Sequence, residues 1–275
     1  MEVVPTRDLE PAGWLVEAIT DFGGRVAQLM PAGYDSVVRI FHRPDQGVPD
    51  VESARSWAEV AARHGTTLHP EAQWIALTGG GLDSHSGPTA PADRPLSGSL
   101  DRFVLARLCE GLAEHTTTPE LCHFALYEGL GKSPIAWDKY PRFALPGRRH
   151  WLFAPVPVRT MPACAVELEV AGIEEQSRQP GGIRGLVVLG RTKVPEDSTN
   201  WVRWHRDEGF VQSPSWWWPE DRAWVVRSEI DYDSTLVACS NDAADALLDH
   251  PDIECLRVTP STSLMDDADQ INHLR

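Results

Sequence analysis

Three consecutive tryptophans, Trp216–Trp218, constrain the fold of this chain more than any other feature of its sequence. Neighbouring side chains of a β-strand point to opposite faces, so a strand cannot place all three indoles on one side of a sheet. At least one must point away from the core, unless the segment is covered on both faces. Because an indole has a large apolar body and one N–H donor, it suits ligand grooves and protein interfaces as well as cores. Structural packing and a binding surface are therefore both open here.

Further tryptophans and arginines lie close to this segment in the sequence. Six of the 11 tryptophans fall within 24 residues, at positions 201, 204, 216, 217, 218 and 224. A partly exposed indole beside a guanidinium makes a cation–π or stacking surface. We therefore predict a ligand-binding surface made of Trp204, Trp217, Trp218, Arg203, Arg206 and Arg222.

No familiar catalytic signature accompanies these residues. The sequence contains no GxSxG, GxxxxGK[ST] or HExxH pattern and no GxGxxG between a strand and a helix. The densest polar group, residues 204–208, supplies His205 and Glu208, and with Glu229 these are the candidate acid and base residues. We expect no metal and no cofactor, because no set of His, Cys and carboxylate residues has a recognised ligand spacing. The five scattered cysteines favour buried thiols over disulfides.

The net charge of −15 is distributed unevenly along the chain. Residues 229–269 hold 11 acids and one base, whereas residues 132–159 hold six bases and one acid. A net-negative protein is repelled by nucleic acid and by anionic membranes, so we expect neither as a partner. The acidic segment is either a solvated face or a docking surface for a basic protein. Arg142, Arg148 and Arg149 either bind an anion or neutralise the protein's own acidic surface.

Helices and strands are mixed in the sequence without a regular βαβ alternation. Apolar periodicity predicts helices over residues 14–22, 53–64 (capped by Ser53), 99–116 and 241–250. Strands are predicted over residues 25–30, 35–42, 121–127, 151–158, 164–170, 183–189, 223–230, 234–239 and 253–258. The C-terminal order strand, strand, helix, strand is typical of α+β packing. We predict an α+β fold with a largely antiparallel sheet or sheets, helices packed on one face, and two lobes as one possible arrangement.

The predicted organisation has three parts. Residues 1–128 form an N-terminal α+β lobe, residues 129–150 a basic loop punctuated by Gly and Pro, and residues 151–275 a C-terminal α+β lobe with a loose acidic tail. No apolar run approaches the roughly 18 residues of a membrane span, and residues 1–10 do not have the pattern of a signal peptide. We therefore expect a cytoplasmic protein, whose oligomeric state the sequence does not indicate.

Several stretches of the chain resemble an uncharacterised family of actinomycete proteins. The resemblance rests on residues 217–224 (WWPEDRAW), followed by SEID at 228–231 and ST at 234–235. Residues 39–44, 115–119 (HTTTP) and 124–129 are further shared stretches, and residues 164–210 are extra length. The resemblance implies a bacterial source and a common fold, and it brings no activity or site residues with it.

Two functions are consistent with these features. The segregated charge, the Trp-dense segment and the lack of a catalytic signature favour a non-enzymatic protein-binding module, of the immunity, antitoxin or adaptor type, with a basic protein as its partner. The alternative is an enzyme that acts on a small anionic or aromatic molecule in a Trp-lined pocket. In that case the arginines would orient the substrate, and His205 with Glu208 or Glu229 would exchange protons with it.

Overall fold

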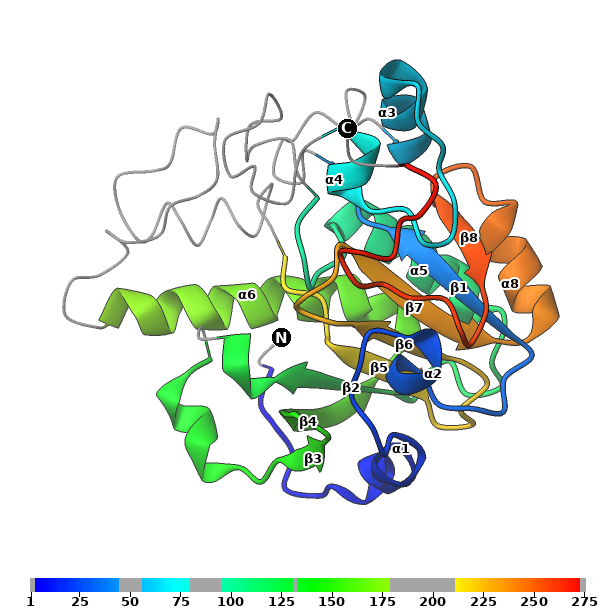
Figure 1. The fold of residues 1–275 in the computed structure, drawn as a ribbon. Helices are drawn as coiled ribbons and strands as arrows, with labels where there is room; N and C mark the ends of the chain where they lie inside the picture. Colours follow the sequence, from blue (N-terminus) through cyan, green and yellow to red (C-terminus); the bar gives the residue numbers. More distant parts are fainter. Residues whose placement is uncertain (1–2, 45–55, 80–94, 131–132, 179–210, 273–275) are drawn as a thin grey trace.

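A single antiparallel sheet organises the molecule. The computed structural model describes residues 3–44, 56–79, 95–130, 133–178 and 211–272. Eight strands in these ranges form one sheet in the order β3-β4-β2-β5-β6-β7-β1-β8, and all neighbours are antiparallel (Figure 1). The strands are β1 Ser36–Phe41, β2 Cys122–Tyr127, β3 Phe143–Leu145, β4 Arg148–Val156, β5 Trp216–Pro219, β6 Val225–Ser228, β7 Ser234–Cys239 and β8 Cys255–Val258.

Helices cover the sheet unequally. The helices α5, α6 and α8 pack against one face through Leu108, Leu168 and Leu247, and short α1 and α2 cover the other face. The predicted α+β fold is confirmed, with the addition of this second helical layer. The helices are α1 Gly13–Ala18, α2 Val26–Leu29, α3 Trp57–His64, α4 Trp74–Leu77, α5 Arg102–Ala113, α6 Met161–Arg178 and α8 Asn241–Leu248, and the 3-10 turns are η1 Glu10–Ala12, η4 Glu128–Leu130, η5 Ile135–Lys139 and η6 Val158–Thr160.

The second layer explains how Trp216–Trp218 fit into one strand. β5 lies inside the sheet, between β2 and β6. The indole of Trp217 enters the core under α5 and packs edge-on against Trp224 at 5.1 Å, while Trp216 and Trp218 enter the core under α1 and α2. All three side chains are at most 1% exposed. The segment is covered on both faces, which is the condition under which consecutive indoles can all be buried.

The sheet interleaves strands from the two ends of the chain. β1 lies between β7 and β8, and β2 lies between β4 and β5. Strands from residues 1–128 therefore pair with strands from residues 151–275. The prediction of a basic loop over 129–150 is wrong for residues 143–150, because β3 and the start of β4 form a hairpin there. The turn of this hairpin is at Gly147, whose φ is 70°.

Two of the predicted strands are helices in the structure. Residues 25–30 contain α2, and residues 164–170 lie within α6. In α6 the residues that face the core, Met161, Ala165, Leu168 and Gly172, recur every three or four positions, which is the helical period. The strand predicted at 183–189 lies outside the described residues. The predictions of strands at 35–42, 121–127 and 234–239 and of a helix at 241–250 are confirmed.

The C-terminal segment is held against the molecule, which corrects the prediction of a loose tail. The carboxylate of Asp269 accepts hydrogen bonds from His69 at 2.8 Å and from the backbone N–H of Gln73 at 3.2 Å. Asn272 donates to the carbonyl of Thr67 at 2.8 Å. Within the described ranges, no helix combines the length and the apolar character needed to cross a membrane.

Candidate functional site

The structure brings together two residues that the sequence assigned to different sites, Glu229 and Arg148. Arg148 on β4 donates from Nε to Glu229 Oε1 at 3.1 Å, and Arg227 on β6 donates from Nη2 to Oε2 at 2.7 Å. Arg148 also donates to Asp231 at 2.7 Å. Both oxygens of the buried Glu229 carboxylate thus accept charge-assisted bonds. This geometry suits an ion network better than a general base, which needs an oxygen available to a substrate proton.

Arg227 and His150 extend this network into the sheet. The Arg227 guanidinium lies 4.6 Å from the Trp216 ring and donates to the carbonyl of Leu29 at 2.7 Å. Burial lowers the pKa of Arg227 despite the favourable charge of Glu229. Burial, followed by the charges of Arg227 and Arg148, lowers the pKa of His150 to about 3. Sequence reasoning missed Arg227, because a single charged residue within a predicted strand is normally read as facing solvent. It placed His150 in the predicted basic loop and not inside a sheet.

The other predicted anion-binding residues also lie in intramolecular ion pairs. Arg142 reaches Glu128 at 2.7 Å and Asp138 at 2.6 Å, and its guanidinium lies 4.7 Å from the Trp151 ring. Arg149 pairs with Glu128 as well. The three predicted anion-binding arginines are therefore paired with the protein's own acids, and among these described pairs those of Arg148 reach the acidic stretch 229–269.

The predicted ligand-binding surface is not assembled by the described residues. Trp217 and Trp218 are core residues, for the reason given above. Arg222 is on the surface, where its guanidinium lies 5.1 Å from the Trp14 ring and its carbonyl accepts a hydrogen bond from the Tyr34 hydroxyl. The remaining predicted residues, Trp204, Arg203, Arg206, His205 and Glu208, lie outside the described residues.

Two of the stretches that carry the family resemblance contact each other. The carboxylate of Asp221, in the 217–224 stretch, accepts bonds from the hydroxyl of Thr116 at 2.7 Å and from the backbone N–H of Thr117 at 2.6 Å. Partial burial opposes ionisation of Asp221, but the hydrogen bonds from Thr117 and Thr116 outweigh it and lower the pKa. This contact joins the end of β5 to the loop before β2, and it is structural.

Three buried polar side chains on the α5 side of the sheet form a hydrogen-bonded chain. It has the composition of a proton relay, but a substrate has no access to it. The ring of His42 bonds to the Leu96 carbonyl at 2.6 Å and to the Thr235 hydroxyl at 2.9 Å, and Thr235 contacts the Ser228 hydroxyl at 2.7 Å. The three side chains are at most 1% exposed. Burial lowers the pKa of His42 to about 4, so the ring is neutral at pH 7. These hydrogen bonds satisfy the buried polar groups, and none of the three side chains reaches solvent.

Metal-ligating groups do not converge in the described parts of the chain. No group of three or more His, Cys, Asp and Glu side chains there is arranged to hold an ion. The prediction of buried thiols is confirmed: four of the five free cysteines are buried and Cys255 is half-buried. Burial raises the pKa of the Cys164 and Cys239 thiols to about 11, which keeps them protonated and weakly reactive.

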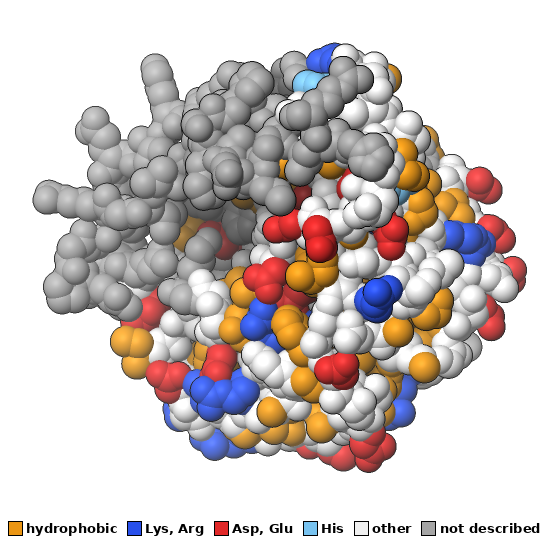
Figure 2. Space-filling view, in the orientation of Figure 1, with side chains coloured by type: hydrophobic (Ala, Val, Ile, Leu, Met, Phe, Trp, Pro, Cys, Tyr) orange, Lys and Arg blue, Asp and Glu red, His pale blue; other side chains and the backbone are white. Residues whose placement is uncertain are grey.

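One surface concentrates exposed acids. The side of α8 opposite its core residues presents Asp242 and Asp245, and the turn that follows adds Asp249 and Asp252. We call these four residues the α8 acidic face. Asp245 pairs with Arg257 at 2.5 Å and Asp252 with Arg107 at 3.3 Å, whereas Asp242 and Asp249 form no ion pair with any described residue. In Figure 2 acidic side chains gather along the right-hand margin, where Figure 1 places α8.

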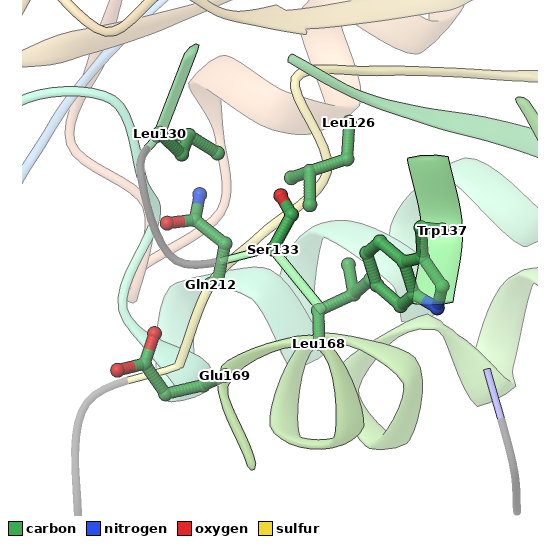
Figure 3. Close-up of a pocket in the computed structure, with 7 residues that line it drawn as sticks. All are labelled: Leu126, Leu130, Ser133, Trp137, Leu168, Glu169 and Gln212. Atoms are coloured by element: carbon green, nitrogen blue, oxygen red, sulfur yellow. The ribbon is translucent and has the colours of Figure 1, made fainter. Parts of the chain in front are cut away.

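A pocket opens on the same side of the sheet as α6. It lies between the end of β2, η5 and α6 (Figure 3), and its cavity volume of about 10 Å³ is enough for about one water molecule. Its walls combine four apolar and three polar residues: Leu126, Leu130, Trp137, Leu168, Ser133, Glu169 and Gln212. Sequence reasoning did not identify this pocket, because its residues come from separate segments that only the tertiary fold brings together.

Comparisons with known proteins add no assignment. The chain matches no protein-family model, no curated protein and no solved structure. The resemblance to the actinomycete family therefore stays a prediction, and any assignment of function rests on the surfaces and cavities described above.

Proposed function

We propose that this chain is a non-enzymatic protein-binding module whose α8 acidic face receives a basic protein. The observation that carries the proposal is the pair of exposed carboxylates, Asp242 and Asp249, that no described cation neutralises. Asp242 lies on α8 and Asp249 caps its C-terminal end, and the other side of this helix is fixed in the core by Ala244 and Leu247, so both charges are presented on a rigid support. Two such carboxylates on a rigid support attract a basic surface and accelerate its association.

The enzymatic alternative has weaker support. Glu229, one of its acid/base candidates, has both oxygens engaged by arginines, and Trp217 and Trp218 are enclosed in the core rather than lining a pocket. The arginines suggested for anion binding already pair with carboxylates of the chain. A small anionic substrate would have to displace these internal partners.

The test combines partner capture with charge reversal at two matched places. The intact chain is used to capture partners from a lysate of its source, and native mass spectrometry identifies any stoichiometric complex. Asp242→Lys/Asp249→Lys should slow association with that partner by about 10-fold or more at low ionic strength. The control, Glu10→Lys/Glu17→Lys, changes the net charge equally near α1, on the opposite face of the sheet, and should change the rate less than about twofold.

Two results would contradict the proposal. One is equal association rates for the wild type and the α8 variant at low salt. The other is an equal loss of rate in both variants, which would show that net charge acts without regard to its location. Thermal unfolding of both variants establishes that they remain folded.

A further inference from the structure

The edge of the sheet at β8 has backbone groups that no neighbouring strand uses. Among the described strands, β8 is the last of the sheet and pairs only with β1. The carbonyl of Glu254, just before β8, accepts a hydrogen bond from the N–H of Phe41 in β1 at 3.0 Å. Because residues of an antiparallel strand face its neighbour alternately, Leu256 also faces β1, whereas the N–H and C=O groups of Cys255 and Arg257 point away from it. Within the described ranges, these outward groups form no hydrogen bond.

Turns close this edge at both ends. The same alternation directs Ile253 and Thr259 outward, but the N–H of Ile253 donates to the carbonyl of His250 at 3.3 Å. The N–H of Thr259 donates to the hydroxyl of Thr262 at 3.0 Å, and the carbonyl of Thr259 accepts from the N–H of Thr262 at 3.0 Å. The open part of the edge is therefore residues 255–257, which a short extended segment matches in length.

The side chains of the two outward-facing residues point to α8, which lies beside β8 in Figure 1. The thiol of Cys255 donates to the carbonyl of Leu247 at 3.4 Å, and Arg257 donates to Asp245 at 2.5 Å. Directly opposite residues of an antiparallel pair place their side chains on the same face of the sheet. A side chain opposite Cys255 is therefore directed to the C-terminal end of α8, where the helix carbonyls and Asp249 both attract a cation.

Charge decides between a second copy of the chain and a segment of another protein. Two copies paired antiparallel along β8 would bring their α8 acidic faces to the same side of the joint sheet, where like charges oppose association. A basic segment is attracted to the same place. We propose that an extended segment of the basic partner adds to the sheet as an antiparallel strand along β8, with a Lys or Arg opposite Cys255. This inference rests on the proposed function for the charge of the partner, and it adds how the partner binds.

Two peptides that differ only in the position of backbone methyl groups test this pairing. The parent probe is the end-blocked peptide Lys-Val-Thr-Val-Lys-Val-Lys, which places its threonine opposite Arg257 when its second lysine lies opposite Cys255. In this register the threonine and that lysine bond to β8, whereas the valine N–H groups face away. Calorimetric titration of the intact chain should show that methylating the backbone nitrogens of the threonine and that lysine weakens binding by about 10-fold or more. Methylating the last two valine nitrogens instead should change the affinity less than about threefold.

Variants of the chain test the edge from the other side. Cys255→Pro removes an N–H that points away from β1, so the pairing of β8 with β1 keeps its hydrogen bonds while the parent peptide should bind about 10-fold more weakly. The matched control Cys255→Val retains this N–H and should bind within about twofold of the wild type. Asp242→Lys/Asp249→Lys should weaken the parent peptide through charge alone. The comparison of the two methylated peptides uses the wild-type chain and does not depend on the folding of any variant.

The outcomes separate this inference from the proposed function. If the two methylated peptides bind equally while Asp242→Lys/Asp249→Lys weakens the parent, the acidic face attracts the peptide and the strand pairing is wrong. If the methylation pattern matters but charge reversal has no effect, the edge pairs as proposed and the role of the acidic face fails. Absence of binding by the parent peptide, or self-association of the wild-type chain that Cys255→Pro abolishes, would overturn the inference; the second result would assign the edge to another copy of the chain.

Discussion

At the scale of single residues, His42 and His150 show how the same side chain can be buried in two ways. Both ring nitrogens of His42 have hydrogen-bond partners, whereas Nδ1 of His150 is enclosed without one. His150 instead stacks on Phe143 at 5.2 Å and lies 5.8 Å from Tyr127. Burial lowers the pKa of both rings, to about 4 for His42 and about 3 for His150. Both are neutral in the folded protein at pH 7.

These lowered pKa values make the folded state sensitive to acid. An unfolded histidine takes up a proton near its ordinary pKa of about 6.5, whereas the folded His150 does so only near pH 3. Between these values the unfolded state binds more protons, so the free energy of unfolding decreases as the pH falls. Each such histidine contributes a slope of up to about 1.4 kcal/mol per pH unit.

Replacement of His150 should remove its share of this acid sensitivity. His150→Phe keeps a flat ring against Phe143 and eliminates a nitrogen without a partner, so we expect stability at pH 7 to change by less than about 1 kcal/mol. Between pH 6.5 and 4.5 the variant should lose up to about 2.7 kcal/mol less than the wild type. Urea unfolding at several pH values measures this difference. The exposed His64→Gln should retain the wild-type slope, and parallel profiles for wild type and His150→Phe would refute the prediction.

At the scale of elements, the free N–H groups at the start of α3 donate to side-chain acceptors from two separate parts of the chain. Ser56 and Glu59 form a capping box, with the Ser56 hydroxyl accepting from the Glu59 N–H at 3.1 Å and the Glu59 carboxylate accepting from the Ser56 N–H at 2.9 Å. Glu254, just before β8, accepts from the N–H groups of Trp57 at 2.6 Å and Ala58 at 2.7 Å. The helix is therefore attached at its first turn to the edge of the sheet.

Removing the cap should have a limited and measurable effect on stability. We expect Ser56→Ala to lower the free energy of unfolding by about 1 kcal/mol, because one N–H loses its acceptor while Glu254 continues to serve two others. Ser56→Asp keeps an acceptor and adds charge at the positive end of the helix, so its stability should equal or exceed that of the wild type. Urea unfolding of the three proteins decides the point, and equal stability of Ser56→Ala and wild type would be evidence against the cap.

The start of α3 also shows how far the sequence predicts elements. A helix ending at Gly65 is confirmed, but its cap is Ser56 rather than Ser53, and the Ser-x-x-Glu spacing at 56–59 is the signal that identifies it. Periodic segments such as 241–250 were predicted because the apolar residues that place one face of the helix in the core recur with the helical period. α2 was missed because four residues are too few to show a period.

The candidate sites were less predictable than the elements. Glu229 and Arg148 could be recognised as charged candidates, but their pairing joins residues 81 positions apart. The pocket joins Ser133, Leu168 and Gln212, which no local pattern relates to one another. Local sequence carries propensity and periodicity, whereas contacts between distant segments depend on the strand order of the whole sheet.

At the scale of the whole molecule, the strand order shows why the two predicted lobes depend on each other. Residues 1–128 contain β1 and β2, which are separated in the sheet by β5, β6 and β7 and do not contact each other as neighbours. Residues 151–275 contain β5, β6 and β7, which are direct neighbours in the sheet. However, β1 lies between this group and β8, and β2 lies between it and β4. Each part therefore lacks neighbours that its own strands need for pairing, and the other part supplies them.

We accordingly predict that the chain unfolds as one cooperative unit. Calorimetry of residues 1–275 should show a single transition with equal calorimetric and van't Hoff enthalpies. The fragments 1–128 and 151–275 should show no cooperative transition alone, because an unpaired strand leaves its N–H and C=O groups and its apolar face in water. Two resolved transitions in the whole chain, or a cooperative transition in either fragment, would show that the lobes fold independently and that the interleaved strands contribute little to their stability.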